Sequence, residues 1–208
     1  MKPPKHLSLV GGAPAPEAGE TADGRRQRSE RSRAQIVDAM MELVRAGDMN
    51  PSAARVADQA GVSLRTVFRH FEEMDSLYRE MTARLEEEIL PLALKPFEAA
   101  DWRGRLGELV TRRAQIFEIM LPFRVAGNVR RFQSDHLMDD YRRAILMERA
   151  ALQGVLPKAA LADAPRAAAL EIATGFQTWR RLRQDMGLTP TQAEAAMRFT
   201  VERLVADL

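Results

Sequence analysis

The sequence contains no cysteine among its 208 residues. A disulfide framework and thiolate chemistry are therefore excluded, and we expect a cytoplasmic protein that folds in a reducing compartment. No stretch comes near the roughly 18 consecutive apolar residues that a membrane helix needs. The apolar run from Leu7 to Val10 is also too short for a secretory signal. We therefore expect no membrane partner.

Motifs typical of catalysis are missing as well. The three histidines, His6, His70 and His136, are scattered and form no HExxH pair for zinc. The sequence has no GxSxG elbow, no GxxxxGK[ST] phosphate loop and no GxGxxG turn. We therefore expect a protein that is not an enzyme, with no catalytic residue, no metal site and no cofactor.

Lysine is scarce, and so is any excess of one charge. The 31 basic residues, nearly all of them arginines, face 29 acidic ones, for a net charge of only +2. The segment from Gly24 to Phe71 nevertheless holds nine arginines and five acidic residues, a net charge of +4. Since the basic excess is concentrated in this segment, it is the candidate for contact with phosphate.

The spacing of apolar residues predicts an all-α protein, because no strand-like alternation is present. Pro, Gly and Ala are frequent in residues 1–24, which we expect to form a flexible tail. Ser29 or Ser32 is expected to cap a first helix that ends near Gly47. A fourth helix is expected from Met74 to Pro91, and longer segments at roughly 102–120, 122–132, 134–153, 163–185 and 190–207.

The stretch PSAARVADQAGVSLRTVFRHF, from Pro51 to Phe71, predicts two short helices joined by a tight turn. Ser52 and Ser63 are suitable N-caps, and Gly61 is a natural left-handed stop between the helices. The second helix has an apolar face made of Leu64, Val67, Phe68 and Phe71, and an outer side made of Arg65, Thr66, Arg69 and His70. This is the helix-turn-helix arrangement, whose second helix fits a major groove about 12 Å wide.

These residues resemble the DNA-binding domain of the TetR/AcrR family of transcriptional regulators. The resemblance covers about 50 residues, from roughly Ser29 to Met81. It rests on Val56-Ala57, Ala60-Gly61-Val62-Ser63, the run from Thr66 to Phe71, and Leu77. Two positions depart from the family pattern, since Phe68 replaces a usual tyrosine and Met74 a common lysine. Both changes weaken phosphate contact. An arginine-rich arm at the start of the first helix, GRRQRSERSR from Gly24 to Arg33, would offset this loss.

The resemblance implies three regions: a tail (1–24), a three-helix helix-turn-helix domain (25–78) and a larger helical ligand-binding and dimerisation domain (79–208), with about nine helices in total. It also implies a homodimer that binds a palindromic DNA operator, with repression as the family's usual outcome. A small apolar effector in the C-terminal domain would release or reposition the dimer, with the fourth helix as the connecting lever.

The resemblance also implies which residues contact DNA: Ser52, Arg55, Ser63, Leu64, Arg65, Thr66, Phe68, Arg69 and His70, with Arg28 and Arg31 from the arm. Arg65 is expected to read a base, guanine by its two-pronged geometry, and Thr66 to contact the backbone or a thymine methyl. The competing interpretations are a solvated helix face for the arginines, a buttress at the helix end for His70, and a soluble tail for the arm.

Aromatic and methionine side chains on the middle helices are candidates for an apolar pocket, although such residues more often form the core. The expected pocket residues are Phe117, Met120, Phe123, Phe132, His136, Met138, Tyr141, Phe176 and Trp179. Family dimers pair their last two helices in a four-helix bundle. The expected dimer residues are therefore Leu170, Ala173, Phe176, Ala193, Met197, Val201 and Leu204.

Two other classes of function compete with a ligand-responsive regulator. One is a helical enzyme or small-molecule carrier with a vestigial helix-turn-helix, which the residues at Ala54, Phe68 and Met74 favour. The other is a nonspecific architectural DNA protein, which leaves more than half of the chain unexplained. The salt dependence and the sequence specificity of DNA binding distinguish the three.

Overall fold

The computed structural model describes residues 18–208, with side chains described from Asp23 onward. Within that range the chain forms ten α-helices and no strand, which confirms the all-α prediction. Most of the expected flexible tail lies outside the described residues. The first four helices are α1 (Ala18–Arg45), α2 (Ala53–Ala60), α3 (Leu64–His70) and α4 (Met74–Ala93). The others are α5 (Trp102–Arg130), α6 (Asp135–Gln153), α7 (Lys158–Ala162), α8 (Ala164–Thr174), α9 (Phe176–Arg180) and α10 (Pro190–Leu204), with one π-helical turn at Arg181–Asp185.

The first helix is longer than the sequence indicates. It begins at Ala18, so the prediction of a cap at Ser29 or Ser32 was wrong, and residues 18–24 are helical rather than part of a tail. Its first buried apolar residue is Ile36. Between Asp23 and Gln35 no apolar side chain is buried that could have marked these turns as helix, and Arg26 and Glu30 join successive turns by a 3.0 Å hydrogen bond.

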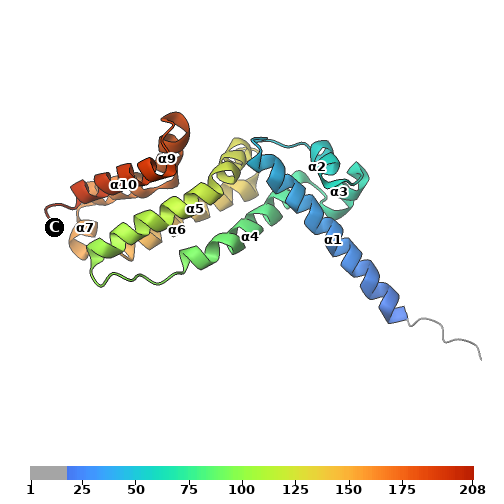
Figure 1. Ribbon diagram of the computed structural model, residues 1–208, viewed down its shortest axis with the longest axis horizontal. Helices are drawn as coiled ribbons and strands as arrows, with labels where there is room; N and C mark the ends of the chain where they lie inside the picture. The colour runs from blue at the N-terminus through green and yellow to red at the C-terminus, as the bar shows by residue number, and fades with distance from the viewer. Residues whose placement is uncertain (1–17) are drawn as a thin grey trace, which may run out of the picture.

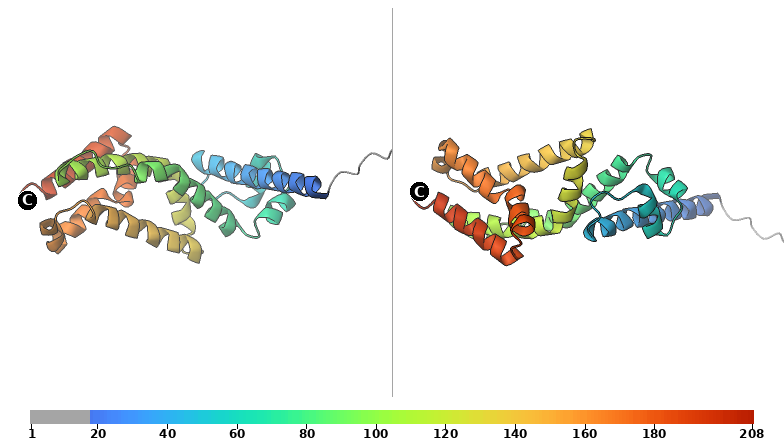
Figure 2. Two further views of the ribbon diagram at one scale, coloured as in Figure 1. Left: turned by 90° about the horizontal axis from the view of Figure 1, so that it is seen from below. Right: turned by 90° about the horizontal axis from the view of Figure 1, so that it is seen from above.

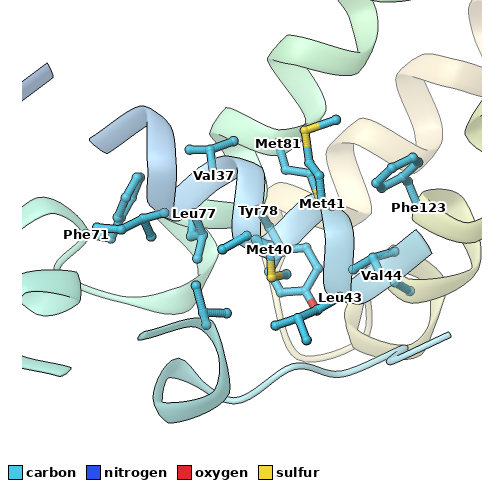
Figure 3. Packing of buried hydrophobic residues seen from close by; sticks show 14 of the residues in the cluster. Val37, Met40, Met41, Leu43, Val44, Phe71, Leu77, Tyr78, Met81 and Phe123 are labelled. Carbon is cyan, nitrogen blue, oxygen red and sulfur yellow. The ribbon is translucent and has the colours of Figure 1, made fainter. Parts of the chain in front are cut away.

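A first apolar core joins α1–α4 to the C-terminal half. The side chains that α1 buries include Val37, Met40 and Val44, and they pack against Phe71, Leu77, Tyr78 and Met81 (Figure 3). Phe123 and Ala126 of α5 and Leu137 of α6 belong to the same cluster. The expected boundary between residues 78 and 79 falls inside α4, which runs unbroken from one unit into the other.

A second core lies between α5 and the C-terminal helices. Leu109 and Val110 of α5 pack there with Leu170, Phe176, Trp179 and Met197. The predicted break between residues 120 and 122 is wrong, because α5 continues through Pro122 to Arg130. Proline removes one hydrogen bond of the helix. Burial of Phe117 and Phe123 on either side, one in each core, holds the helix together across that position.

The segment predicted as one helix from 163 to 185 is instead broken at Gly175. Side chains from two other helices satisfy the backbone groups that this break leaves open. Arg113 of α5 donates to the carbonyl of Thr174 at 2.9 Å, and the Glu148 carboxylate of α6 accepts from the Phe176 N–H at 3.2 Å. The break therefore depends on contacts that are distant in sequence.

The molecule is elongated, with different elements at its two ends (Figures 1 and 2). The N-terminal half of α1 lies with α2 and α3 at one end, and α10 with the chain's C-terminus at the other. Helices α4 and α5 connect the ends. None of the described helices combines the length and the apolar character needed to span a membrane.

Candidate nucleic-acid interface

Local capping fixes the turn between α2 and α3. The Ser52 hydroxyl accepts the N–H of Arg55, as the sequence predicts for an N-cap. Gly61 has φ = 65°, in the left-handed region, and its N–H closes the end of α2 on the carbonyl of Asp58. Helix α3 then begins after a second N-cap, Ser63, whose hydroxyl accepts the N–H of Thr66 at 3.1 Å.

The apolar face of α3 is narrower than predicted. Val67 and Phe71 are buried, at 1% and 2% exposure, and they fasten the helix to α1 and α2. Leu64 and Phe68 were expected on the same face but are 44% and 47% exposed, because the short helix lies on its neighbours along a single edge. Their exposure places both side chains on the outer surface, beside the arginines.

Two arginines of α3 are free to bind another molecule. Arg65 and Arg69 are exposed, and within residues 23–208 neither forms a hydrogen bond or an ion pair. Arg55 of α2 is exposed too, but it pairs with Asp48 at 3.0 Å, which neutralises its charge. The hydroxyls of Ser63 and Thr66 hydrogen-bond to each other at 2.9 Å at the start of the helix.

His70 closes α3 as a structural residue. Its carbonyl accepts a 2.8 Å hydrogen bond from Arg33 of α1, which also pairs with Glu80 of α4 and lies over the Phe71 ring. Burial, then the neighbouring charges of Arg69 and Arg33, lower the pKa of His70 below its ordinary value of 6.5. The imidazole is therefore neutral at pH 7 and adds no positive charge to the surface.

The arginine-rich arm is a helical extension of α1 rather than a loose strand. Arg28 and Arg31 are exposed on this extension; Arg28 donates to the carbonyl of Gly24, and Arg31 has no partner among the described residues. Arg33 belongs to the fold instead, since Glu80 holds it. The arm, α2 and α3 lie at the same end of the molecule (Figure 1).

One arginine from the far end of α5 ties the two units together. Arg130 donates to the side-chain oxygen of Asn50 at 2.9 Å, in the loop just before α2. Its guanidinium also lies 3.7 Å from Asp75, at the start of α4, and 5.3 Å from the centre of the Tyr78 ring. A movement of α5 would therefore reach the base of the helix-turn-helix directly.

A cavity of about 560 Å³ lies between α4, α5 and α6. Four of the predicted pocket residues line it: Phe117, Met120, Phe123 and Tyr141. Five do not: Phe132, His136, Met138, Phe176 and Trp179. Phe132 is 75% exposed, and His136 pairs with Asp140 at 3.0 Å. Phe176 and Trp179 are buried in the second core.

Sequence reasoning missed two groups of residues that line the cavity. Helix α4 contributes Met81, Leu85 and Ile89, and α5 contributes Arg112 and Arg113. The spacing of Arg113, four residues after Leu109 and four before Phe117, puts an arginine on an apolar stripe. That pattern signals a charged group facing the interior and could have been found in the sequence.

The residues predicted for the dimer interface lie inside the protomer. Leu170, Ala173, Phe176, Ala193, Met197 and Val201 are all buried in the second core, and Leu204 packs against it. The most apolar stripe of α10 packs on α5 and α8, and that of α8 packs on α10 and α6, which leaves the opposite faces of α8 and α10 to solvent. Those faces carry Ile172, 71% exposed, and Phe199, 59% exposed.

Comparison with solved structures places this arrangement among known folds. A transcriptional regulator from Rhodococcus sp. Rha1 is similar with a TM-score of 0.64 at 21% sequence identity, over 86% of this chain and 96% of that one. A protein from Mesorhizobium loti MAFF303099 assigned to the TetR family of transcriptional regulators gives 0.54 at 16% identity, over 86% and 97%. The chain has the fold of TetR-family regulators. No family model matches it, and no curated protein is significantly similar in sequence.

The TetR-type fold accounts for both the parts that the sequence predicted and those it did not. The first three helices form the expected helix-turn-helix unit, and the remaining helices form a larger unit with a cavity. Met74, where the family commonly has lysine, packs against the first core instead of facing solvent. Met74 therefore cannot make the phosphate contacts that a lysine would make at this position.

Proposed function

We propose that this protein is a ligand-responsive transcriptional regulator that binds a palindromic DNA operator as a homodimer. The single observation that carries the proposal is the surface of α3: Val67 and Phe71 anchor the helix, while Arg65 and Arg69 face outward without partners. Arginine forks match guanine edges and phosphates, and a major groove admits one helix.

Selection from a random duplex library tests the DNA-binding part of this proposal. The wild-type protein should enrich an inverted repeat whose half-site centres lie about 34–36 Å apart, one helical turn. Arg65→Ala should weaken binding to that site by about 1–3 kcal/mol and relax the preference at one base pair. The matched control is Arg142→Ala on α6, where the arginine is exposed but pairs with Asp139.

The result that overturns the assignment is an Arg65→Ala variant with unchanged affinity and sequence preference. A protein that enriches no site at low salt is a carrier rather than a regulator. A protein that binds every duplex equally well is an architectural DNA protein.

The homodimer is proposed to form through the exposed faces of α8 and α10. Ile172 and Phe199 are large apolar side chains that stay exposed in the protomer, although Arg203 lies 5.1 Å from the centre of the Phe199 ring. Ala168 and Ala195 beside them permit close approach of helices. The double variant Ile172→Glu with Phe199→Glu should raise the dimer dissociation constant by at least about 30-fold, since each residue would be a central apolar contact. Sedimentation velocity measures this; an unchanged dimer would place the interface elsewhere.

The effector is proposed to occupy the cavity and act through α4. Met81, Leu85 and Ile89 line the cavity, and the same helix begins three residues after Phe71 closes α3. A ligand that shifts α4 would change the distance between the two recognition helices of the dimer. Addition of a cavity ligand should then lower operator affinity by about 5–150-fold. A ligand that fills the cavity and leaves operator affinity unchanged would exclude this route.

A further inference from the structure

The cavity is long and narrow. Its lining residues on α5 run from Leu109 to Asn128, nineteen positions, which is about 28 Å of helix. Apolar side chains such as Ile116, Phe117 and Met120 cover most of that length. A volume of about 560 Å³ spread over such a distance favours an extended molecule over a compact ring system.

The carboxylates along the cavity already have partners. Glu86 and Asp140 each lie 2.8 Å from the guanidinium of Arg143. Glu148 lies 2.6 Å from Arg124. Because Arg143 serves two carboxylates, the group of Glu86, Asp140 and Arg143 has a net charge of −1, whereas the Arg124–Glu148 pair is neutral.

Arg113 has no such partner. It is 5% exposed and forms no ion pair with a described residue; its hydrogen bonds go to the backbone and hydroxyl of Thr174 and to the backbone of Glu148. These three bonds leave two of the five guanidinium donors unused. Burial lowers the pKa of Arg113 to about 10, although Glu148 and Glu171 act in the opposite direction. The group remains charged at pH 7, as a buried cation whose nearest carboxylates, Glu148 and Glu171, compensate it only from a distance.

Arg112, the preceding residue of α5, also lines the cavity. Its guanidinium lies 4.3 Å from the centre of the Phe97 ring and donates to the carbonyl of Ala93 at 3.2 Å, without an ion pair. Phe97 also lines the cavity, from the loop between α4 and α5. Four arginines and three carboxylates line the cavity, for a net charge of +1. Arg112 and Arg113 contribute +2, and the group around Arg143 contributes −1.

We propose that the cavity binds a long unbranched chain with one anionic head group, the head lying between Arg112 and Arg113 and the chain running along α5 toward Gly127. This inference rests on the proposed function, in that the cavity is its effector site. The far end has room, since a Cβ at Gly127 would meet no atom within 4 Å. From Arg113 to Gly127 is fourteen residues, about 21 Å. An extended sixteen-carbon chain has fifteen C–C bonds and is about 19 Å long, at about 1.25 Å per bond.

Binding of matched probes to the full-length protein tests the head group. Equilibrium dialysis at pH 7 would compare hexadecanoate, hexadecyl phosphate, hexadecanol and hexadecyltrimethylammonium, all below their aggregation concentrations. At least one anion should bind about tenfold or more tighter than hexadecanol, at one molecule per protomer, and the cation should bind most weakly. The better of the two anions identifies the head group as carboxylate or phosphate. Equal binding of the alcohol, or tighter binding of the cation, overturns the proposal.

Two variants test the orientation. Arg112→Gln should remove most of the preference for the anion and leave hexadecanol binding unchanged, whereas Arg142→Gln, away from the cavity, should change neither. Gly127→Leu should weaken hexadecanoate binding at least fivefold and leave the shorter octanoate unaffected, because only the longer chain reaches that position. Retention of the full anion preference in Arg112→Gln, or equal loss for both chain lengths in Gly127→Leu, overturns the arrangement.

Helix content by circular dichroism confirms that each variant is folded before binding is measured. The dialysis contains no DNA, so its outcome is independent of the proposed regulator function. Failure of both anions to bind overturns the proposed ligand class and leaves the operator selection with Arg65→Ala as it stands. Conversely, a protein that binds the anion and no operator would be a carrier of such chains.

Discussion

Arginines at the two ends of the molecule have different surroundings. At the helix-turn-helix end, Arg31, Arg65 and Arg69 lie in solvent with no described partner. In the C-terminal half most arginines are paired with carboxylates, as Arg124 is with Glu148 at 2.6 Å and Arg183 with Glu118 at 2.7 Å. Pairing is not confined to one end, since Arg33 and Arg55 pair with Glu80 and Asp48, and Arg181 is exposed with no described partner. Paired arginines therefore stabilise the fold, and those of α3 are available for intermolecular contact.

This difference is informative because the total charge of the chain is nearly balanced, at +2. A net charge this small gives little field for attracting nucleic acid. A few arginines that have no acidic neighbour create a local positive surface without a large overall charge. The two unpaired arginines of the C-terminal cavity, Arg112 and Arg113, follow the same rule on the inside of the protein.

The largest effect is expected when a paired arginine of the C-terminal half is removed. Arg124 and Glu148 are mostly buried, with side chains 12% and 18% exposed, and Arg124 also lies 3.9 Å from the centre of the Phe176 ring. Arg124→Met should lower the free energy of unfolding by about 3–5 kcal/mol, because a buried carboxylate is left without its counter-charge. Urea denaturation measures the loss.

The double variant Arg124→Met with Glu148→Gln is the control for that measurement. It removes both charges of the pair and should recover part of the lost stability, the rest being lost because Glu148 also compensates the buried Arg113. If Arg124→Met costs less than about 1 kcal/mol, the pair is no more structural than a surface ion pair. The contrast between the two ends would then disappear.

A smaller, pH-dependent effect is expected at Glu118. Its carboxylate accepts from Arg183 at 2.7 and 2.8 Å and from the Trp179 indole at 3.2 Å, which fastens the region after Gly175 to α5. The hydrogen bond from Arg183 lowers the pKa of Glu118 below its ordinary value. The stabilisation is therefore present above the unfolded pKa of about 4.3 and is lost as the pH falls below it.

Glu118→Gln should accordingly cost about 1 kcal/mol at pH 7, a value reduced by the partial exposure of the side chain. Thermal or urea denaturation at pH 7 and near pH 3 checks this. The difference from the wild type should shrink toward zero at the lower pH. A difference that stays constant with pH would mean that the charge of Glu118 is not what holds this region.

Local signals in the sequence predicted the helix-turn-helix well. The caps at Ser52 and Ser63 and the left-handed Gly61 lie within a few residues of the groups they satisfy, so one stretch of chain determines them. Burial of Val67 and Phe71 followed from helical spacing alone. The exposure of Leu64 and Phe68 did not, because it depends on how far α1 and α2 extend beneath a short helix.

The C-terminal half was predicted less well because its determinants are distant in sequence. The break at Gly175 is held by Arg113 and Glu148, which are 61 and 28 residues from their partners. The expected dimer residues on α8 and α10 were the most apolar ones, and these are the residues that a protomer buries first. Periodicity identifies an apolar stripe but does not distinguish the core of one chain from an interface between two.

The smallest effect on stability, and the sharpest test of the contrast, is expected for unpaired arginines at the DNA end. Arg69→Ala should change the free energy of unfolding by less than about 0.5 kcal/mol, since the side chain is exposed and makes no contact to lose. The same variant should reduce the salt dependence of binding to any duplex by about one unit of log–log slope, because one phosphate contact is removed. Fluorescence anisotropy on a random-sequence duplex at several salt concentrations measures this without knowledge of the operator.

The control is Arg142→Ala. Arg142 is also exposed, but it is paired with Asp139, so its removal should leave the slope unchanged. If the two variants change the slope equally, the lack of a carboxylate partner does not identify the arginines that bind DNA.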